Sequence, residues 1–92
     1  MLRKFVIERD IPDVGLLTQP QLQGAAQTSC AALAQLGPKV QWVQSYVAKN
    51  KTFCIYLAQD EAAIQEHARL SGFPATVITE VTTIIDPTTA RG

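Results

Sequence analysis

The sequence is poor in the residues from which most metal and catalytic sites are built. It contains one histidine, His67, and two cysteines, Cys30 and Cys54. A single histidine excludes a site made of several histidines from one chain, so any metal site must add carboxylates, backbone groups or a second subunit. The apolar contexts of the cysteines are typical of small buried thiols, not of a disulfide or a zinc motif. Nucleophile elbows, glycine-rich phosphate loops and a recognisable Ser/His/Asp arrangement are also absent.

Charge is sparse and balanced along the chain. Eight Lys and Arg residues offset eight Asp and Glu residues, and neither sign is clustered. Nucleic acids and anionic membranes select basic surfaces, so neither partner is expected. The apolar run near the N-terminus covers only Phe5–Ile7, which is too short for a signal peptide or a membrane span. The sequence therefore predicts a cytoplasmic protein.

The length of the chain fits one small domain. We assign residues 1–87 to that domain and residues 88–92 to a short polar tail. A chain of this size buries only about 60 to 65% of its unfolded surface when it folds. Burial of more surface through self-association would therefore stabilise it.

Two helices have clear start and stop signals. Thr18 and Gln21 have the spacing of a capping box, and Gly37 ends the helix that they begin. Asp60 is suited to cap the second helix, which Gly72 ends. Each segment carries one apolar stripe at helical spacing, so both helices are expected to pack on a sheet.

Four further segments have strand patterns. Leu2–Arg9 and Gln41–Val47 alternate with a two-residue period, and Phe53–Leu57 is apolar on both faces. Val77–Ile85 is β-branched at eight of nine positions, which favours a last strand. The resulting order, βαββαβ, predicts an α+β ferredoxin-like fold with a four-stranded antiparallel sheet whose middle strands are the first and third.

Such a fold places both helices on one face of the sheet and leaves the other face open. We expect the helix-facing residues to be Phe5, Ile7, Val43, Val47, Ile55 and Leu57. The open face would then carry Val6, Glu8, Trp42, Gln44, Tyr46, Cys54, Tyr56, Ile78 and Glu80. An aromatic and aliphatic surface of this kind is typical of an interaction site, and two such sheets facing each other would form a homodimeric α+β barrel.

The predicted open face also supplies the candidate ligand site. In a closed dimer it would enclose a small-molecule pocket bounded by Glu8, Trp42, Gln44, Tyr46, Tyr56 and Glu80. A carboxylate there could act as a metal ligand, a base or half of a hydrogen bond across the dimer. The simpler alternative places Glu8 and Glu80 at the rim, in water or paired with Arg9 or Lys4. His67 lies on an apolar helix stripe, which favours a structural histidine over a metal ligand.

Five stretches carry a family resemblance: VIERDIP (6–12), QWVQSYV (41–47), TFCIYLAQDEAAIQEHARLSGFPA (52–75), ITEV (78–81) and IDPTT (85–89). Together they resemble a small bacterial family of ferredoxin-like proteins of unknown function that includes nickel-binding, nickel-responsive proteins. The resemblance implies the same fold, a dimeric α+β barrel and nickel as a possible cofactor, with no assigned reaction.

One position departs from that resemblance. Family members commonly carry histidine where this chain has Gln44, and an amide is a poorer nickel ligand than imidazole. The candidate metal ligands that remain are His67, Glu8 and Glu80. Two hypotheses follow: a non-enzymatic nickel-binding or nickel-responsive dimer, or a barrel that binds a small molecule or acts on one without a cofactor, as small monooxygenases and isomerases with the same dimer do.

Overall fold

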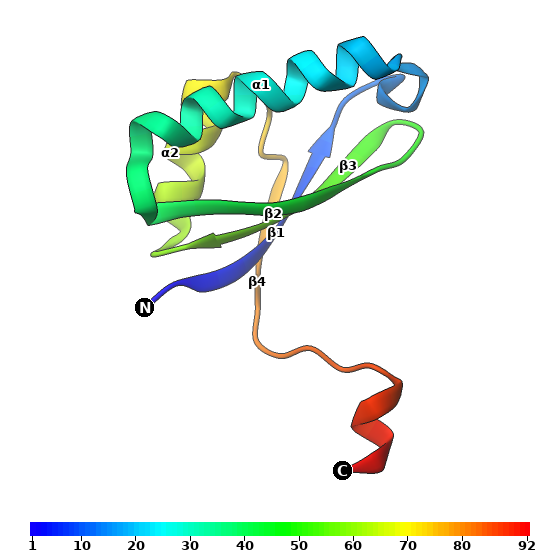
Figure 1. Ribbon diagram of the computed structural model, residues 1–92, viewed down its shortest axis with the longest axis vertical. Helices are drawn as coiled ribbons and strands as arrows, with labels where there is room; N and C mark the ends of the chain where they lie inside the picture. Colours follow the sequence, from blue (N-terminus) through cyan, green and yellow to red (C-terminus); the bar gives the residue numbers. More distant parts are fainter.

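The computed structural model describes residues 1–92 as a four-stranded antiparallel sheet with two helices on one face (Figure 1). The strands are β1 (Arg3–Asp10), β2 (Val40–Val47), β3 (Lys51–Ala58) and β4 (Val77–Val81), and the helices are α1 (Gln19–Leu36) and α2 (Glu61–Ser71). The spatial order β2-β3-β1-β4 places β1 and β3 in the middle. The predicted ferredoxin-like fold is confirmed. Neither helix combines the length and apolar character needed to cross a membrane.

The predicted helix signals are present in the structure. The Thr18 hydroxyl accepts from the N–H of Gln21, whose side chain accepts from the N–H of Thr18. Asp60 accepts from the N–H of Ala63 at 2.9 Å and so caps α2. Gly72 ends α2 with φ 78, a left-handed conformation that glycine adopts at little cost. Local chemistry therefore sets the bounds of both helices.

The hydrophobic core lies between the helices and the sheet. Its buried members are Phe5, Ile7, Val40, Cys54, Tyr56, Ala58 and Ile64. Phe5 and Ile7 face the helices as predicted, but the prediction was wrong for β3. Cys54 and Tyr56 lie directly opposite Ile7 and Phe5 and face the helices with them, whereas Ile55 takes the open face. Leu57 takes that face too. Because both faces of β3 are apolar, periodicity could not choose between them, and only the register with β1 does so.

A β-bulge at Val43 changes the faces of β2. The pairing with β3 skips one residue between Trp42 and Gln44. Trp42 lies opposite Tyr56 on the helix-facing side, contrary to the prediction, and Val43 is 52% exposed instead of facing the helices. Tyr46 lies on the open face. An extra residue in one strand shifts the alternation of faces, so residues before and after it follow different phases. A strict two-residue count therefore assigns one of the two segments to the wrong face.

Strand β4 is shorter than predicted and presents the opposite faces. It ends at Val81, opposite Lys4 of β1 and before the predicted end at Ile85. Ile78 pairs with Ile7 and packs against the core, and Glu80 projects to the same side at the sheet edge. Both were predicted on the open face. Beyond Val81 the chain runs away from the domain and ends in a short 3₁₀ helix, η3 (Pro87–Arg91) (Figure 1).

The open face of the sheet carries an apolar patch. We define this open-face patch as Val6, Phe53, Ile55, Leu57 and Val81, which are only half-buried, together with Tyr46, which is 57% exposed. The patch is bordered by ion pairs from Lys51 to Glu8, at 3.3 Å, and to Asp10, at 3.6 Å. The two sheet faces thus have separate characters: one is the core, and the other is an exposed apolar surface with a charged edge.

Candidate functional site

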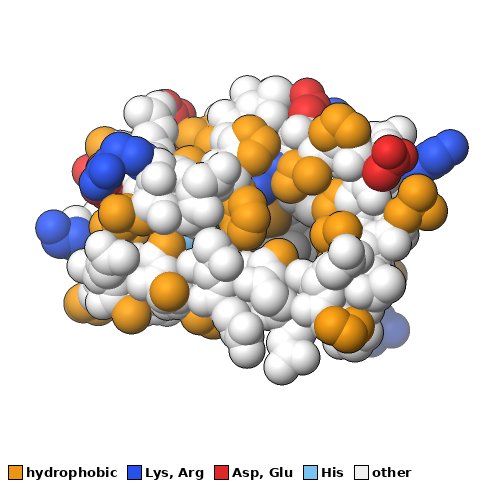
Figure 2. Space-filling view, turned by 90° about the horizontal axis from the view of Figure 1, so that it is seen from above, with side chains coloured by type: hydrophobic (Ala, Val, Ile, Leu, Met, Phe, Trp, Pro, Cys, Tyr) orange, Lys and Arg blue, Asp and Glu red, His pale blue; other side chains and the backbone are white.

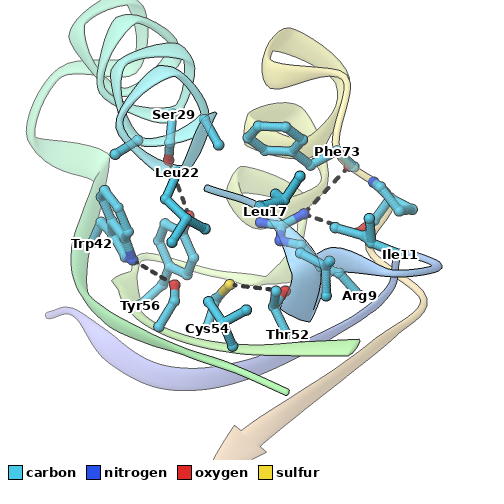
Figure 3. Close-up of a pocket in the computed structure, with 16 residues that line it drawn as sticks. Arg9, Ile11, Leu17, Leu22, Ser29, Trp42, Thr52, Cys54, Tyr56 and Phe73 are labelled. Atoms are coloured by element: carbon cyan, nitrogen blue, oxygen red, sulfur yellow. Dashed lines mark hydrogen bonds between the residues drawn. The ribbon is translucent and has the colours of Figure 1, made fainter. Parts of the chain in front are cut away.

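A cavity of about 380 Å³, partly open to solvent, lies between the helix-facing side of the sheet, the first half of α1 and the loop after β1 (Figure 3). Its apolar wall consists of Ile11, Val14, Leu17, Leu22, Ala25, Ala26, Trp42, Val47, Phe73 and Pro74. The remaining lining residues are Arg9, Ser29, Ser45, Thr52, Cys54 and Tyr56. A mostly apolar cavity with a few convergent polar groups is the usual form of a small-molecule site.

The loop between β1 and α1 forms one wall of the cavity. It contains the short 3₁₀ helix η1 (Val14–Leu16), whose Val14 is 5% exposed. The N–H of Gly15 donates to the carbonyl of Lys49 at 2.9 Å, in the β2–β3 turn. A Cβ at Gly15 would lie 2.7 Å from the carbonyl oxygen of Ala48, so only glycine allows the loop to approach this turn. The hairpin turn thereby holds the wall in place.

Arg9 is a buried cation on the cavity surface. It is 2% exposed, and its Nη1 donates to the backbone carbonyls of Phe73, at 3.3 Å, and Pro74, at 3.0 Å. Its Nη2 has no hydrogen-bond partner, and none of the ion pairs includes Arg9. The carbonyls just beyond the C-terminal end of α2 offset part of its charge. A buried charge without a counter-ion costs several kcal/mol, which makes Arg9 the most unusual residue of the site.

Sequence reasoning missed Arg9 as a site residue, although a signal was present. Arg9 continues the two-residue phase of Phe5 and Ile7, so it belongs to the same face of β1. We considered it only as a possible surface partner of Glu8 or Glu80. A charged side chain usually lies at the surface, whereas the two-residue alternation of β1 places Arg9 on the buried face. The prediction from the alternation is the correct one.

A chain of three buried polar side chains runs from the cavity floor into the core. Ser29 Oγ lies 3.3 Å from the hydroxyl of Tyr56 and 3.2 Å from Nε2 of His67. Nδ1 of His67 is buried and has no partner. An N–H left without an acceptor is rarer in proteins than an unused lone pair, so we place the proton of the neutral ring on Nε2. The chain then has three protons, one each on Nε2, Ser29 and Tyr56, but it makes only two hydrogen bonds. One hydroxyl proton is therefore free to donate to a ligand.

The contact between Ser29 and His67 has the distance of a nucleophile and its base, but not their setting. In a catalytic triad a third group holds the second ring nitrogen, whereas Nδ1 of His67 has no partner. Ser29 is 4% exposed and lies within α1, with its hydroxyl bridging two other side chains. This arrangement is suited to holding a ligand by hydrogen bonds.

Burial lowers the pKa of His67 below its ordinary value, and the positive charge of Arg9 lowers it further, against the effect of the hydrogen bond that His67 donates to Ser29. The unfolded chain, with a histidine pKa of about 6.5, then binds more protons than the folded chain as the pH falls. Stability present at neutral pH is therefore lost below about pH 6.5. Urea unfolding at about pH 7.5 and 5.5 should show this loss.

His67→Gln is the matched control for this prediction, because His67 is the only histidine of the chain. The variant should have a nearly constant free energy of unfolding between the two pH values. An equal loss of stability in the variant and the natural protein would contradict the assignment to His67. The hydroxyl of Tyr56 stays protonated throughout, because burial raises its pKa more than Ser29 and Arg9 lower it.

The three predicted metal ligands do not come together in one chain. His67 is fully buried in the core and bonded to Ser29. Glu8 pairs with Lys51 beside the open-face patch, and Glu80 pairs with Arg3 at 3.6 Å. No group of three or more His, Cys, Asp or Glu side chains is placed to hold a metal ion. The donor set of one chain therefore does not fit nickel.

The residues of the predicted pocket divide between the two faces of the sheet. Trp42 and Tyr56 line the cavity on the helix-facing side. Glu8, Gln44 and Tyr46 lie on the open face, where Nε2 of Gln44 donates to the Tyr46 hydroxyl at 2.6 Å. Two of the three predicted aromatic residues thus contribute to a cavity, but one on the other side of the sheet.

The two cysteines are both free thiols. Cys54 is buried as expected and lines the cavity, with its Sγ 3.6 Å from Oγ1 of Thr52. Cys30 is exposed on α1, contrary to the buried thiol that its apolar context predicted. The residues that α1 buries fully are Ser29 and Ala32.

Comparison with known proteins gives a family for this fold and site. A family model described as "Nickel responsive protein SCO4226-like" matches residues 5–81. The structure is similar to one reported as "Crystal structure analysis of SCO4226 from Streptomyces coelicolor A3(2)", with a TM-score of 0.74, 21% sequence identity, and coverage of 89% of this chain and 99% of that chain. No curated protein sequence matches the chain significantly. The structural likeness shows a shared fold, and the family match spans most of the chain, which therefore belongs to the SCO4226-like family of nickel-responsive proteins.

Proposed function

We propose that the protein is a non-enzymatic, homodimeric member of this family that binds a small molecule in the cavity beneath α1. The cavity carries the proposal: it measures about 380 Å³, its wall is mostly apolar, and Arg9, Ser29 and Tyr56 supply polar groups at its floor. This volume lies within the range of about 300–1,000 Å³ that is usual for ligand sites. The hydroxyl groups are suited to orienting a ligand, and no group is placed to act as a nucleophile with an oriented base.

The open-face patch supports the homodimer. Contiguous apolar patches on small domains mark contact surfaces, and a twofold arrangement would set the same patch of each protomer against the other. The tail beyond β4 adds Ile84 and Ile85, which are 64% and 76% exposed and available to a second chain. The cavity lies on the opposite side of the sheet from the patch, so dimerisation would leave its mouth accessible.

A nickel-binding role is the second candidate, and the description of the family favours it. Because His67, Glu8 and Glu80 lie apart in one chain, nickel would need ligands from two protomers. Native mass spectra of the metal-free protein, recorded with and without nickel(II), test this. Uptake of a defined number of ions would support the role, and unchanged masses would contradict it. The same spectra report whether the protein is a dimer.

A cavity-filling variant tests the small-molecule function. Trp42 is the only tryptophan and lines the cavity, so its fluorescence reports binding there. We expect a set of neutral, anionic and cationic fragments to contain compounds that change this fluorescence. Ala26→Phe, which puts a ring into the cavity, should weaken their binding by roughly ten- to a hundredfold, since overpacking costs about 1–3 kcal/mol.

Ala34→Phe is the matched control, because Ala34 lies on the exposed side of the same helix and does not line the cavity. It should bind the same compounds as the natural protein. Failure of the whole fragment set to bind the natural protein, or equal binding by both variants, would overturn the proposed function.

A further inference from the structure

We infer that the ligand of the cavity is a small monoanion with an apolar body, of which a monocarboxylic acid is the simplest example, and that its acid group binds the guanidinium group of Arg9. This inference rests on the proposed function, because it requires the cavity to bind a small molecule. It adds the charge and shape of that molecule.

The hydrogen bonding of Arg9 is incomplete without an anion. Nη1 donates to two backbone carbonyls, while the buried Nη2 donates to nothing. Carbonyl oxygens carry only partial charge, so the guanidinium keeps a net positive charge at a site that is 2% exposed. Water screens such a charge poorly, and a carboxylate is the partner that both neutralises a guanidinium and accepts its hydrogen bonds.

A second donor lies near the guanidinium. The Cζ of Arg9 is 6.0 Å from the ring centre of Tyr56, whose hydroxyl belongs to the polar chain with Ser29 and His67. That chain has one proton more than it has hydrogen bonds, so one hydroxyl proton is free. A carboxylate has two oxygens, so one can accept from Arg9 while the other accepts from this hydroxyl.

The charge of the lining selects against cations. None of the residues that line the cavity is Asp or Glu, and Arg9 is the only Lys or Arg among them. An ammonium group would meet a like charge and no counter-ion. A second negative charge on the ligand would find no cation either and would be desolvated against an apolar wall. The lining therefore favours a single negative charge.

The apolar wall indicates that the part of the ligand beyond its acid group is apolar. Figure 3 shows Leu22, Trp42 and Phe73 around the cavity, with Arg9 among the lining side chains. Figure 2, seen from above, shows a basic side chain recessed among hydrophobic ones. An aliphatic chain or a single ring would bury its surface against this wall while its acid group reached the floor.

A matched set of ligands tests the inference on the natural protein. We would measure Trp42 fluorescence and titration calorimetry with octanoate, octanamide and octylamine, and with 4-ethylbenzoate and 4-ethylbenzamide. Because charge-assisted hydrogen bonds are about twice as strong as neutral ones, each carboxylate should bind at least about tenfold more tightly than its amide. Octylamine should not bind.

Arg9→Met tests the assignment of the charge, because it removes the guanidinium and keeps a long apolar side chain. The carboxylates should then bind no more tightly than their amides. Arg3→Met is the matched control: Arg3 lies on the same strand and the same face, but it is exposed and paired with Glu80. It should keep the preference for carboxylates. If Arg9→Met does not fold, Arg9→Lys is measured in its place. Because it keeps a charge, it should keep the preference for carboxylates over amides.

The outcomes separate the inference from the proposed function. Equal binding of carboxylates and amides by the natural protein would overturn the inference and leave a neutral-ligand site. Persistence of the preference in a folded Arg9→Met variant would overturn the role of Arg9. Absence of binding by every compound here and in the fragment set would overturn the proposed function, and the inference with it.

Discussion

Ile55→Asp is expected to convert the proposed dimer to a monomer while the fold is kept. Ile55 lies at the centre of the open-face patch, opposite Val6 on β1 and Gln44 on β2. In the twofold dimer the substitution would bury an unpaired carboxylate from each protomer, which costs about 3–5 kcal/mol or more. The dimer dissociation constant should therefore rise by about a thousandfold, as measured by analytical ultracentrifugation over a range of micromolar concentrations.

Leu16→Asp is the matched control for this change. Leu16 is 74% exposed in η1, away from the open-face patch, and the substitution adds the same charge to the chain. This variant should sediment as the natural protein does. A natural protein that is monomeric at these concentrations, or an Ile55→Asp variant that stays dimeric, would show that the patch is not the interface.

Tyr56→Ala is expected to lower the free energy of unfolding by about 3–5 kcal/mol, the usual cost of truncating a buried aromatic side chain. Tyr56 is 2% exposed, and its ring centre lies 6.5 Å from that of Trp42 and 5.0 Å from that of His67. Its removal leaves a void beneath the cavity and takes a partner from Ser29. For a domain whose total stability is about 5–15 kcal/mol, this loss brings the chain close to unfolding.

Tyr56→Phe separates packing from hydrogen bonding in the same experiment. It keeps the ring and removes the hydroxyl, so we expect a loss of only about 1 kcal/mol. Urea unfolding at one fixed protein concentration measures both variants, since the stability of a dimer depends on concentration. Leu16→Ala, at an exposed position, should change stability by less than about 0.5 kcal/mol. Equal losses for Tyr56→Ala and Tyr56→Phe would contradict this division.

The fold was predictable because its signals are local. Thr18 with Gln21, Asp60 and Gly72 set the bounds of the helices through hydrogen bonds to neighbours in the sequence. The order of elements followed from these bounds and from the β-branched run that begins at Val77. Each signal is read within a few residues and does not depend on the rest of the structure.

The candidate site was not predictable because its determinants are long-range. The bulge at Val43 and the register of β3 with β1 decide that Trp42 and Tyr56 face the helices, and neither is visible in one segment. The bond from Ser29 to His67 joins two helices, and Arg9 bonds to carbonyls that lie more than sixty positions away in the sequence. Tertiary contacts overrode the surface preference of a charged side chain.

The bulge at Val43 also makes one strand a member of both proposed binding surfaces. Trp42, before it, lines the cavity, and Tyr46, after it, belongs to the open-face patch. Binding free energies at two sites are reciprocal, so a ligand that strengthens dimerisation by some factor is itself bound more tightly by the dimer by the same factor. In the proposed dimer, a cavity coupled to the patch in this way would bind its ligand with an affinity that depends on protein concentration, and expression level would become a means of regulating occupancy.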